Sequence, residues 1–228
     1  MAAKPSIIAL DGPVAVGKTT VGRALARRMG YRFYDTGAMY RALTWLALQK
    51  GVDPRDETAL TQLAQHSRIQ LLPGTDGDEG GLLVDGRDIT SELRESEVEA
   101  SVSPVSEVAG VRRCLVAQQR ELAQGGGVVM AGRDIGTVVL PQADLKVFLI
   151  ASPEERAHRR QQELLAQGKE APYEKVLENL RRRDRIDSQR AHSPLKPAQG
   201  AEVIDTDSLT LEQVLERVMK LVQEALCR

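Results

Sequence analysis

The sequence predicts an α/β fold in which a parallel sheet of five strands is covered by helices on both faces. Three observations predict it. A phosphate-binding loop lies at residues 12–19, between an apolar run and a helical pattern. Short apolar runs alternate with amphipathic segments along the rest of the chain. Hydrophobic residues make up 42% of the 228 residues, which is enough to bury a core.

The first predicted strand, Ile7–Leu10, leads into Gly-Pro-Val-Ala-Val-Gly-Lys-Thr, and the helix Lys18–Met29 follows. This fits the phosphate-loop pattern G-x-x-x-x-G-K-[ST] in the context that the pattern requires. Backbone N–H groups of such a loop surround a phosphate chain, and the helix N-terminus adds partial positive charge. Lys18 can reach the β- and γ-phosphates, and the Thr19 hydroxyl can bind Mg²⁺. The residues predicted to hold the triphosphate are Gly12, Pro13, Val14, Ala15, Val16, Gly17, Lys18, Thr19 and Thr20.

Four further apolar runs complete the predicted sheet, and helical patterns separate them. The strands are Arg32–Tyr34, Val128–Met130, Leu145–Ile150 and Glu202–Ile204. The helices are Ala38–Lys50, Glu57–His66, Val105–Gln124, Pro153–Gln167, Tyr173–Asp187 and Leu211–Leu226. This alternation is typical of a parallel sheet, in which ligands bind at the carboxyl ends of the strands.

Residues 67–91 break the alternation. Two apolar segments, Ile69–Leu72 and Leu82–Val84, are joined by the turn-rich stretch Pro73–Gly81, and Asp85-Gly86 follows as a hairpin signal. We predict a small antiparallel insertion between two parts of the core, residues 1–66 and 92–228. Such an insertion can act as a flap that helps to close over a second substrate.

An arginine-rich region at about 154–190 predicts a helical lid. Its two helices flank Gln167–Pro172, where Gly and Pro permit a hinge. Arginine forms bidentate contacts with phosphate, so the lid is expected to close over a triphosphate. The predicted lid arginines are Arg156, Arg159, Arg160 and Arg181, with Arg182 and Arg183 as further candidates.

Composition excludes several classes of protein. The net charge of −1 argues against binding to nucleic acid, which needs a broad basic surface. The N-terminus has no cationic stretch followed by an apolar run, and no apolar run approaches the roughly 18 residues that span a bilayer. We therefore expect a cytoplasmic protein with no membrane partner, acting as a monomer.

Other motifs separate the classes of phosphate-loop protein. Asn179 is the one asparagine, and its surroundings do not match the guanine-reading motif N-K-x-D. The strand at 128–131 ends in no acidic pair of the kind that motor ATPases use to polarise water. A kinase needs no polarised water, because it excludes water and holds an acceptor in line. The remaining class is a kinase.

Three further segments follow predicted strand or helix ends: Asp35–Arg41, Gly132–Thr137 and Arg183–Arg190. Together with the phosphate loop they resemble the bacterial-type cytidylate kinases, which are P-loop nucleoside monophosphate kinases, over essentially the whole chain. The resemblance implies a P-loop kinase core and Mg²⁺-dependent transfer of the γ-phosphoryl group of ATP to CMP or dCMP. It also implies that the insertion at 67–91 is the monophosphate-binding region.

The resemblance implies a CMP site of eight residues. Thr36, Arg41 and Arg133 match positions that bind the phosphate, Ser103, Arg112 and Asp134 match positions that bind the base, and Asp187 and Arg190 match positions that contact sugar and phosphate. An aspartate can accept from the N4 amine of cytosine, where uracil presents a carbonyl oxygen. Lys18, Arg133 and Arg190 are the predicted catalytic residues. At i and i+3 of a helix, Asp187 and Arg190 could instead form a surface ion pair.

The sequence departs from the family pattern at two positions. Ala15 stands where a glycine is usual, which narrows the conformations open to the loop. Ala131 stands where an acidic residue often precedes Gly-Arg-Asp. If that carboxylate normally holds a water bound to Mg²⁺, Asp35 or Asp11 must take its place.

Two other classes of protein share part of this pattern. A shikimate kinase shares the loop and carries a Gly-Gly-Gly motif, which 125–127 matches; these glycines, however, precede the third strand, and Asp35-Thr36-Gly37 replaces the expected D-x-D. A non-catalytic nucleotide-binding switch is the second alternative. The presence of Lys18 and Thr19 argues against it.

Overall fold

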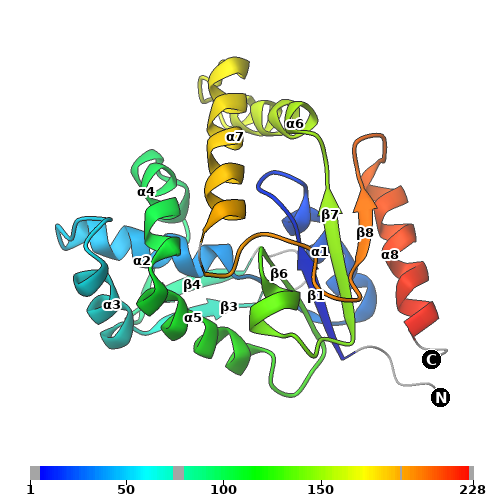
Figure 1. Cartoon of the computed structure of the whole chain (residues 1–228), viewed down its shortest axis with the longest axis horizontal. Coiled ribbons are helices and arrows are strands. Elements are labelled where there is room, and N and C mark those ends of the chain that lie inside the picture. The colour runs from blue at the N-terminus through cyan, green and yellow to red at the C-terminus, as the bar shows by residue number, and fades with distance from the viewer. Residues whose placement is uncertain (1–5, 74–79, 191, 226–228) are drawn as a thin grey trace.

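A computed structural model describes residues 6–73, 80–190 and 192–225 and shows a five-stranded parallel sheet with a smaller antiparallel sheet beside it (Figure 1). The strand order in the large sheet is β2-β6-β1-β7-β8. All four neighbouring pairs are parallel. The predicted fold class is confirmed. The strands are β1 Ile7–Asp11, β2 Arg32–Asp35, β6 Val128–Gly132, β7 Leu145–Ile150 and β8 Glu202–Asp205.

Helices cover both faces of the large sheet, which explains why its central strands are continuous apolar runs. On β1, Ile8 and Leu10 pack in a cluster with α1 (Lys18–Met29) and α8 (Leu211–Ala225). Ala9 points to the other face, where it packs with side chains that follow β6. The predicted end of the last helix, Leu226, lies outside the described residues.

A side lobe, residues 37–122, lies next to the large sheet and has its own hydrophobic cluster (Figure 1). Its antiparallel sheet consists of β3 Ile69–Leu72, β4 Gly81–Val84 and β5 Arg87–Asp88. Its helices are α2 Gly37–Gln49, α3 Glu57–His66, η1 Glu92–Arg94, α4 Ser96–Glu107 and α5 Ala109–Leu122. Asp85 and Gly86 have φ values of 51° and 83°, as a tight hairpin turn requires. The predicted turn at 73–81 falls largely outside the described residues, and the boundaries at 66 and 92 stay predictions.

The prediction of one helix over Val105–Gln124 was wrong. Two helices, α4 and α5, meet at Val108, which is extended with φ −62° and ψ 116°. Val108 is buried and apolar, so it continues the helical pattern, and no side-chain cap marks the start of α5. The residues of α4 before position 105 include three Ser and two Val, which are weaker helix formers than Ala or Leu, and Pro104 lies inside the helix. The break lets Ser103 and Arg112 come from two different helices.

The predicted lid helices are present as α6 Pro153–Ala166 and α7 Tyr173–Gln189, at the carboxyl ends of β1 and β7 (Figure 1). They pack on each other through an apolar cluster of Ala157, Ala171, Val176, Leu177 and Leu180. Val14 and Ala15 of the phosphate loop pack against the same cluster. The base of the lid therefore rests on the loop.

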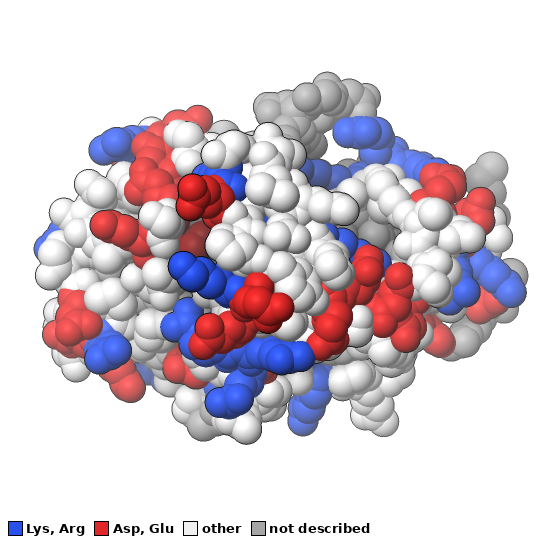
Figure 2. Space-filling view, turned by 90° about the horizontal axis from the view of Figure 1, so that it is seen from above, with Lys and Arg blue, Asp and Glu red and all other residues white. Residues whose placement is uncertain are grey.

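Seen from the lid end, Lys and Arg side chains are interspersed with Asp and Glu over the described surface (Figure 2). Several arginines of the lid helices form ion pairs with acidic neighbours, among them Arg181 with Glu154 at 2.6 Å. Within the described ranges, no helix combines the length and apolar character needed to cross a membrane.

Candidate active site

The phosphate loop connects β1 to α1 through backbone conformations that residues other than glycine rarely adopt. Gly12 has φ 150°, and a Cβ atom there would lie 2.4 Å from the carbonyl oxygen of Leu149 on β7. Gly17 has φ 96° and Ala15 has φ 60°. Left-handed residues within such a turn bring successive N–H groups toward one hollow, which suits an anion. Lys18 is the first residue of α1.

The Lys18 ammonium crosses the beginning of the loop. Its Nζ donates to the carbonyl oxygens of Gly12 and Pro13, at 2.8 and 2.6 Å. Burial, and then the nearby charge of Arg133, lower the pKa of Lys18 to about 7, although Asp35 and Asp11 act in the opposite direction. A phosphate in the loop would restore the charged form of the lysine.

Asp35, at the end of β2, lies beside the loop threonine. Thr19 Oγ1 donates to Asp35 Oδ2 at 3.2 Å, and Asp35 also accepts from Gly37 N at 3.0 Å and lies 3.4 Å from Arg41. Burial alone would raise the pKa of Asp35, but Arg41, Lys18 and the Thr19 hydroxyl outweigh burial and hold that pKa below its usual value. A hydroxyl next to an ionised carboxylate offers the oxygen ligands that Mg²⁺ prefers.

Asp11, the other carboxylate considered for Mg²⁺, has a different task. Its two oxygens accept from the backbone N–H groups of Ile135 and Gly136, both at 2.8 Å. Burial raises the pKa of Asp11 to about 6. Ile135 and Gly136 begin η2, a π-helical turn at Ile135–Val139. Asp11 therefore fixes the segment that follows Arg133 and Asp134, and Asp35 is the carboxylate that lies next to Thr19.

Asp134, after β6, forms a buried pair with Arg112 from α5. Arg112 Nη2 donates to Asp134 Oδ2, Arg112 Nη1 donates to the carbonyl oxygen of Ser106 at 3.1 Å, and the guanidinium lies over the Tyr40 ring, 5.3 Å from its centroid. Both partners are buried. The structure thus brings together the predicted base-reading residues Arg112 and Asp134.

Asp187, on α7, joins two further arginines. It accepts from Nε of Arg133, and Arg190 Nη1 lies 3.7 Å from its other oxygen. Arg190 Nη2 also lies 4.0 Å from Asp134. Asp187 and Arg190 are both buried, so the alternative of a surface ion pair was wrong.

Thr36 and Ser103, two further predicted site residues, lie on different elements and make local hydrogen bonds. The buried Thr36 hydroxyl donates to the carbonyl oxygen of Ala131 at 3.0 Å, which ties the end of β2 to the end of β6. Ser103 is half-buried on α4, where its carbonyl oxygen accepts from the Ser106 hydroxyl at 2.8 Å. The Thr36 side chain thus orders the strand ends beside the loop, and Ser103 lies one helical turn before the break at Val108.

Several guanidinium donors of this region have no hydrogen-bond partner among the described residues. They are Arg41 Nε, Arg112 Nε, Arg183 Nε and Arg190 Nη2, all of them buried. A buried donor without a partner costs free energy, so such groups are rare unless a ligand satisfies them. Ion pairs place Arg41 beside Asp35, and Arg112 and Arg190 beside Asp134. Arg183 lies close enough to Arg133 and Arg41 for their charges to act on it. This arrangement fits an anionic ligand rich in hydrogen-bond acceptors.

The predicted lid arginines are mostly engaged with protein groups. Arg156 holds both oxygens of Asp184 and donates to the carbonyl oxygen of Val14 at 3.1 Å. Arg159 binds Thr206, at 2.6 Å to its carbonyl oxygen, and Arg160 lies between Glu163 and Glu99. Arg181 is exposed and pairs with Glu154. Within the described contacts, none of these four arginines pairs with Asp35, Asp134 or Asp187.

Arg183 is the lid arginine that lies near Arg133 and Arg41. Its side chain is 11% exposed, and burial together with Arg133 lowers its pKa to about 10. The sequence did not single it out, although a signal was present. Arg183, Asp187 and Arg190 follow each other at spacings of four and three, which places them on one face of a helix.

Comparison with known proteins identifies the family. The family model described as cytidylate kinase matches residues 8–224. The chain belongs to the cytidylate kinase family. The cytidylate kinase of Bacillus licheniformis is 48% identical over 221 residues, which are 97% of each chain. That of Geobacillus kaustophilus is 52% identical over 217 residues, covering 95% of this chain and 96% of that one.

A solved structure supports the fold alone. A gluconokinase from Sinorhizobium meliloti 1021 is 15% identical, with a TM-score of 0.50 over 96% of this chain and 93% of that chain. The cytidylate kinase family match extends over nearly the whole chain, so the resemblance seen in the sequence is confirmed. It favours cytidylate kinase over the shikimate kinase alternative.

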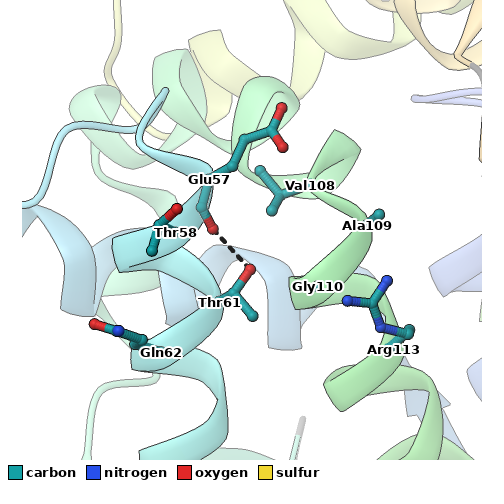
Figure 3. Close-up of a pocket in the computed structure, with 8 residues that line it drawn as sticks. All are labelled: Glu57, Thr58, Thr61, Gln62, Val108, Ala109, Gly110 and Arg113. Carbon is teal, nitrogen blue, oxygen red and sulfur yellow. Dashed lines mark hydrogen bonds between the residues drawn. The ribbon is translucent and has the colours of Figure 1, made fainter.

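A second hollow lies between α3 and α5, among residues that contribute nothing to the cluster described above (Figure 3). Its volume is about 310 Å³. At one edge of the hollow α5 approaches α3 closely at Gly110, where a Cβ atom would lie 2.0 Å from Thr61 Oγ1. The lining residues are Glu57, Thr58, Thr61, Gln62, Val108, Ala109, Gly110 and Arg113.

Proposed function

We propose that the protein transfers the γ-phosphoryl group of ATP to CMP or dCMP, giving ADP and CDP or dCDP. One observation carries the proposal. Arg112 and Arg190, which both pair with Asp134, each carry a buried guanidinium donor without a partner among the described residues, and they lie beside a phosphate loop at the same end of the sheet. A donor site for a triphosphate and an acceptor site for a second phosphate with a polar base therefore lie side by side.

On the donor side, the backbone of residues 12–20 and the Lys18 ammonium bind the phosphates of ATP. Thr19 and Asp35, which are hydrogen-bonded to each other, would hold Mg²⁺ through their oxygen atoms. Bound there, Mg²⁺ supplies positive charge that neutralises the phosphate oxygens. Asp35 takes the part that an acidic residue at position 131 would otherwise have.

On the acceptor side, Asp134 accepts a hydrogen bond from the N4 amine of cytosine, and Arg112 donates to its N3 or O2 atom. Ser103 approaches the base from α4. Uracil would place a carbonyl oxygen against the Asp134 carboxylate and leave the pair unsatisfied, which disfavours UMP. The specificity of this site depends on buried polar groups.

The remaining residues bind the sugar and the phosphate of the acceptor. Asp187 accepts from a sugar hydroxyl, and Arg190 lies between Asp187 and Asp134, where it can contact both sugar and phosphate. Arg41 and Arg133 donate to the monophosphate. The buried Thr36 hydroxyl holds the ends of β2 and β6 against each other beneath that phosphate.

Transfer then depends on position and charge. The acceptor is already an anionic phosphate, so no strong general base is required. Lys18, Arg133, Arg183 and Arg190 stabilise the charge that shifts toward the leaving ADP. The lid helices keep water away from the phosphoryl group during transfer.

A coupled assay of ADP formation with CMP, dCMP, UMP and shikimate tests the proposal. We expect turnover with CMP or dCMP, a much lower kcat/KM with UMP, and none with shikimate. Omission of Mg²⁺ should abolish turnover. Phosphorylation of shikimate but not CMP would overturn the proposal.

We also propose that the enzyme works as a monomer in the cytoplasm, without nucleic acid as a partner. Acidic residues slightly outnumber basic ones, 32 to 31, which disfavours a nucleic-acid partner. Sedimentation analysis in the presence of both substrates measures the oligomeric state. A stable dimer would contradict the proposal.

A further inference from the structure

Glu99 lies on α4, in the side lobe, and pairs with arginines from both lid helices. Arg160 Nη2, from α6, is 3.1 Å from each of its carboxylate oxygens. Arg183 Nη1, from α7, is 3.9 Å from Glu99 Oε2. One carboxylate therefore connects α4 with α6 and α7. No role has so far been assigned to it.

The surroundings of Arg183 show why such a partner matters. Arg183 is close enough to Arg133 and Arg41 for their charges to lower its pKa, whereas Glu99 and then Asp187 act in the opposite direction. Its Nε is buried and has no hydrogen-bond partner among the described residues. A guanidinium held among other cations will move away from them unless an anion keeps it in place. Glu99 is an anion that reaches Arg183 from α4 of the side lobe.

We propose that Glu99 is a positioning residue, which holds Arg160 and Arg183 from the side lobe so that Arg183 stays directed at the transferring phosphate. The proposal rests on the phosphoryl transfer proposed above. Because α4 also carries Ser103, one helical turn further on, the same contact connects the position of the lid to the acceptor site. Glu99 itself touches no substrate in this role.

An isolated surface ion pair contributes little, and three features make Glu99 different. Its side chain is 30% exposed, and those of Arg160 and Arg183 are 20% and 11% exposed, so water screens the group only partly. It has two cationic partners. These partners lie on different helices of the lid, so the contact restrains the lid as well as one side chain.

A matched control is available in the same group of charges. Glu163 also binds Arg160, at 2.8 Å, but it lies on α6 three residues from that arginine. Its own contact with the side lobe is longer and more exposed, because Arg94 Nη1 of η1 lies 3.8 Å away and both side chains are about half exposed. Glu163→Gln removes the same charge from the same guanidinium without breaking the bridge from α4 to Arg160. Glu99→Gln has nearly the same shape as the parent residue and removes that bridge. Glu99→Asp keeps the charge on a shorter side chain.

Steady-state kinetics with ATP and CMP is the first test. We expect Glu99→Gln to lower kcat about five-fold, the effect of roughly one ion pair within a network. The ratio of kcat/KM for CMP to that for UMP should stay the same, since Arg183 contacts no base. Glu99→Asp should recover part of the loss, and Glu163→Gln should stay within about two-fold of the parent. An unchanged kcat in Glu99→Gln would overturn the proposal, and so would an increase, which would mean that Glu99 competes with phosphate for Arg183.

Hydrogen exchange over residues 153–189 is the second test and needs no turnover. Exchange in α6 and α7 should be faster in Glu99→Gln than in Glu163→Gln, in the presence of ATP. Equal protection in the two variants would also overturn the role of Glu99. A parent enzyme that fails to phosphorylate CMP would overturn the proposed function instead, so the two failures are distinguishable.

Discussion

The two halves of the active site are built in different ways. The phosphate loop is one contiguous segment, and it would hold its ligand mainly with backbone N–H groups set by Gly12, Ala15 and Gly17. The acceptor half uses side chains from several elements. Arg112 comes from α5, Asp134 follows β6, and Asp187 lies on α7.

This difference determines what each half can recognise. Backbone N–H groups are alike in every residue, so a loop of this kind binds phosphate with little regard to the base. Buried side-chain pairs such as Arg112–Asp134 have fixed donors and acceptors, and a ligand with the wrong pattern leaves them unpaired. A substitution in the loop should therefore lower activity toward every acceptor, whereas a substitution in the acceptor half should change the preference between acceptors.

Lys18→Ala is the largest test of this contrast. Loss of the one charged side chain that the loop places under the phosphates should lower kcat with CMP and with UMP by about 10²–10³-fold, with little change in their ratio. The coupled ADP assay measures both rates. Lys220→Ala, an exposed lysine on α8 whose side chain is 77% exposed, is the control and should behave like the parent. Parent-like turnover in Lys18→Ala would remove the lysine from the mechanism.

Asp134→Asn should instead change the choice of acceptor. The new amide can donate to the O4 atom of uracil, so the preference for CMP over UMP should fall by about tenfold or more. The variant also leaves Arg112 buried without its counter-ion, which can cost about 3–5 kcal/mol of stability. The ratio of kcat/KM values is independent of the folded fraction and remains the decisive measurement. A constant ratio would exclude Asp134 from base recognition.

The pH dependence of ATP binding tests the loop alone. The pKa of Lys18 is about 7, against an ordinary value of 10.5, because burial and Arg133 disfavour its charged form. Asp35, Asp11 and Asp187 face it as well and favour the charge. At pH 8 the lysine is largely neutral, and a bound triphosphate makes it take up a proton.

The dissociation constant for ATP should therefore rise from pH 7.5 to 9, by at most about tenfold per pH unit. Calorimetry at pH 8 in two buffers of different ionisation enthalpy should report proton uptake. The uptake should be absent in Lys18→Ala. Equal heats in both buffers for the parent would show that Lys18 is already charged before ATP binds.

The sequence predicted the parts of the molecule that depend on neighbouring residues. The phosphate loop, the five strands and the Asp85–Gly86 turn are each encoded within a few positions. Glycines at the turns and short apolar runs in the strands are visible in the local sequence. Resemblance to the family added the identities of the acceptor residues. It did not give their partners. Arg112 and Asp134 are 22 positions apart, and Arg133 and Asp187 are 54 apart.

The misses share one physical cause. The break at Val108 has no side-chain cap, and the residues that flank it, Pro104 and Gly110, both lie inside helices. Gly110 lies where α5 packs against α3, a contact that the local sequence does not reveal. Asp11 holds the backbone of Ile135 and Gly136, more than a hundred positions away. The sequence does not show this contact, so Asp11 remained a candidate for Mg²⁺ there. Arg183 was left among six similar arginines. Only tertiary contacts distinguish these groups.

Ala15 offers the smallest and finest test of the loop. Its φ of 60° costs an alanine roughly 1–2 kcal/mol that a glycine would avoid. Two terms oppose the gain from Ala15→Gly, because the glycine makes the unfolded chain more flexible and the lost methyl group packs against the cluster at the base of the lid. We expect Ala15→Gly to raise the free energy of unfolding by no more than about 1 kcal/mol and to leave kcat/KM within two-fold. Ala15→Val should destabilise by more than that, because a β-branched residue at positive φ is strained. Urea unfolding of the three proteins measures the series, and an Ala15→Val variant as stable as the parent would show that the loop does not hold position 15 in the left-handed conformation.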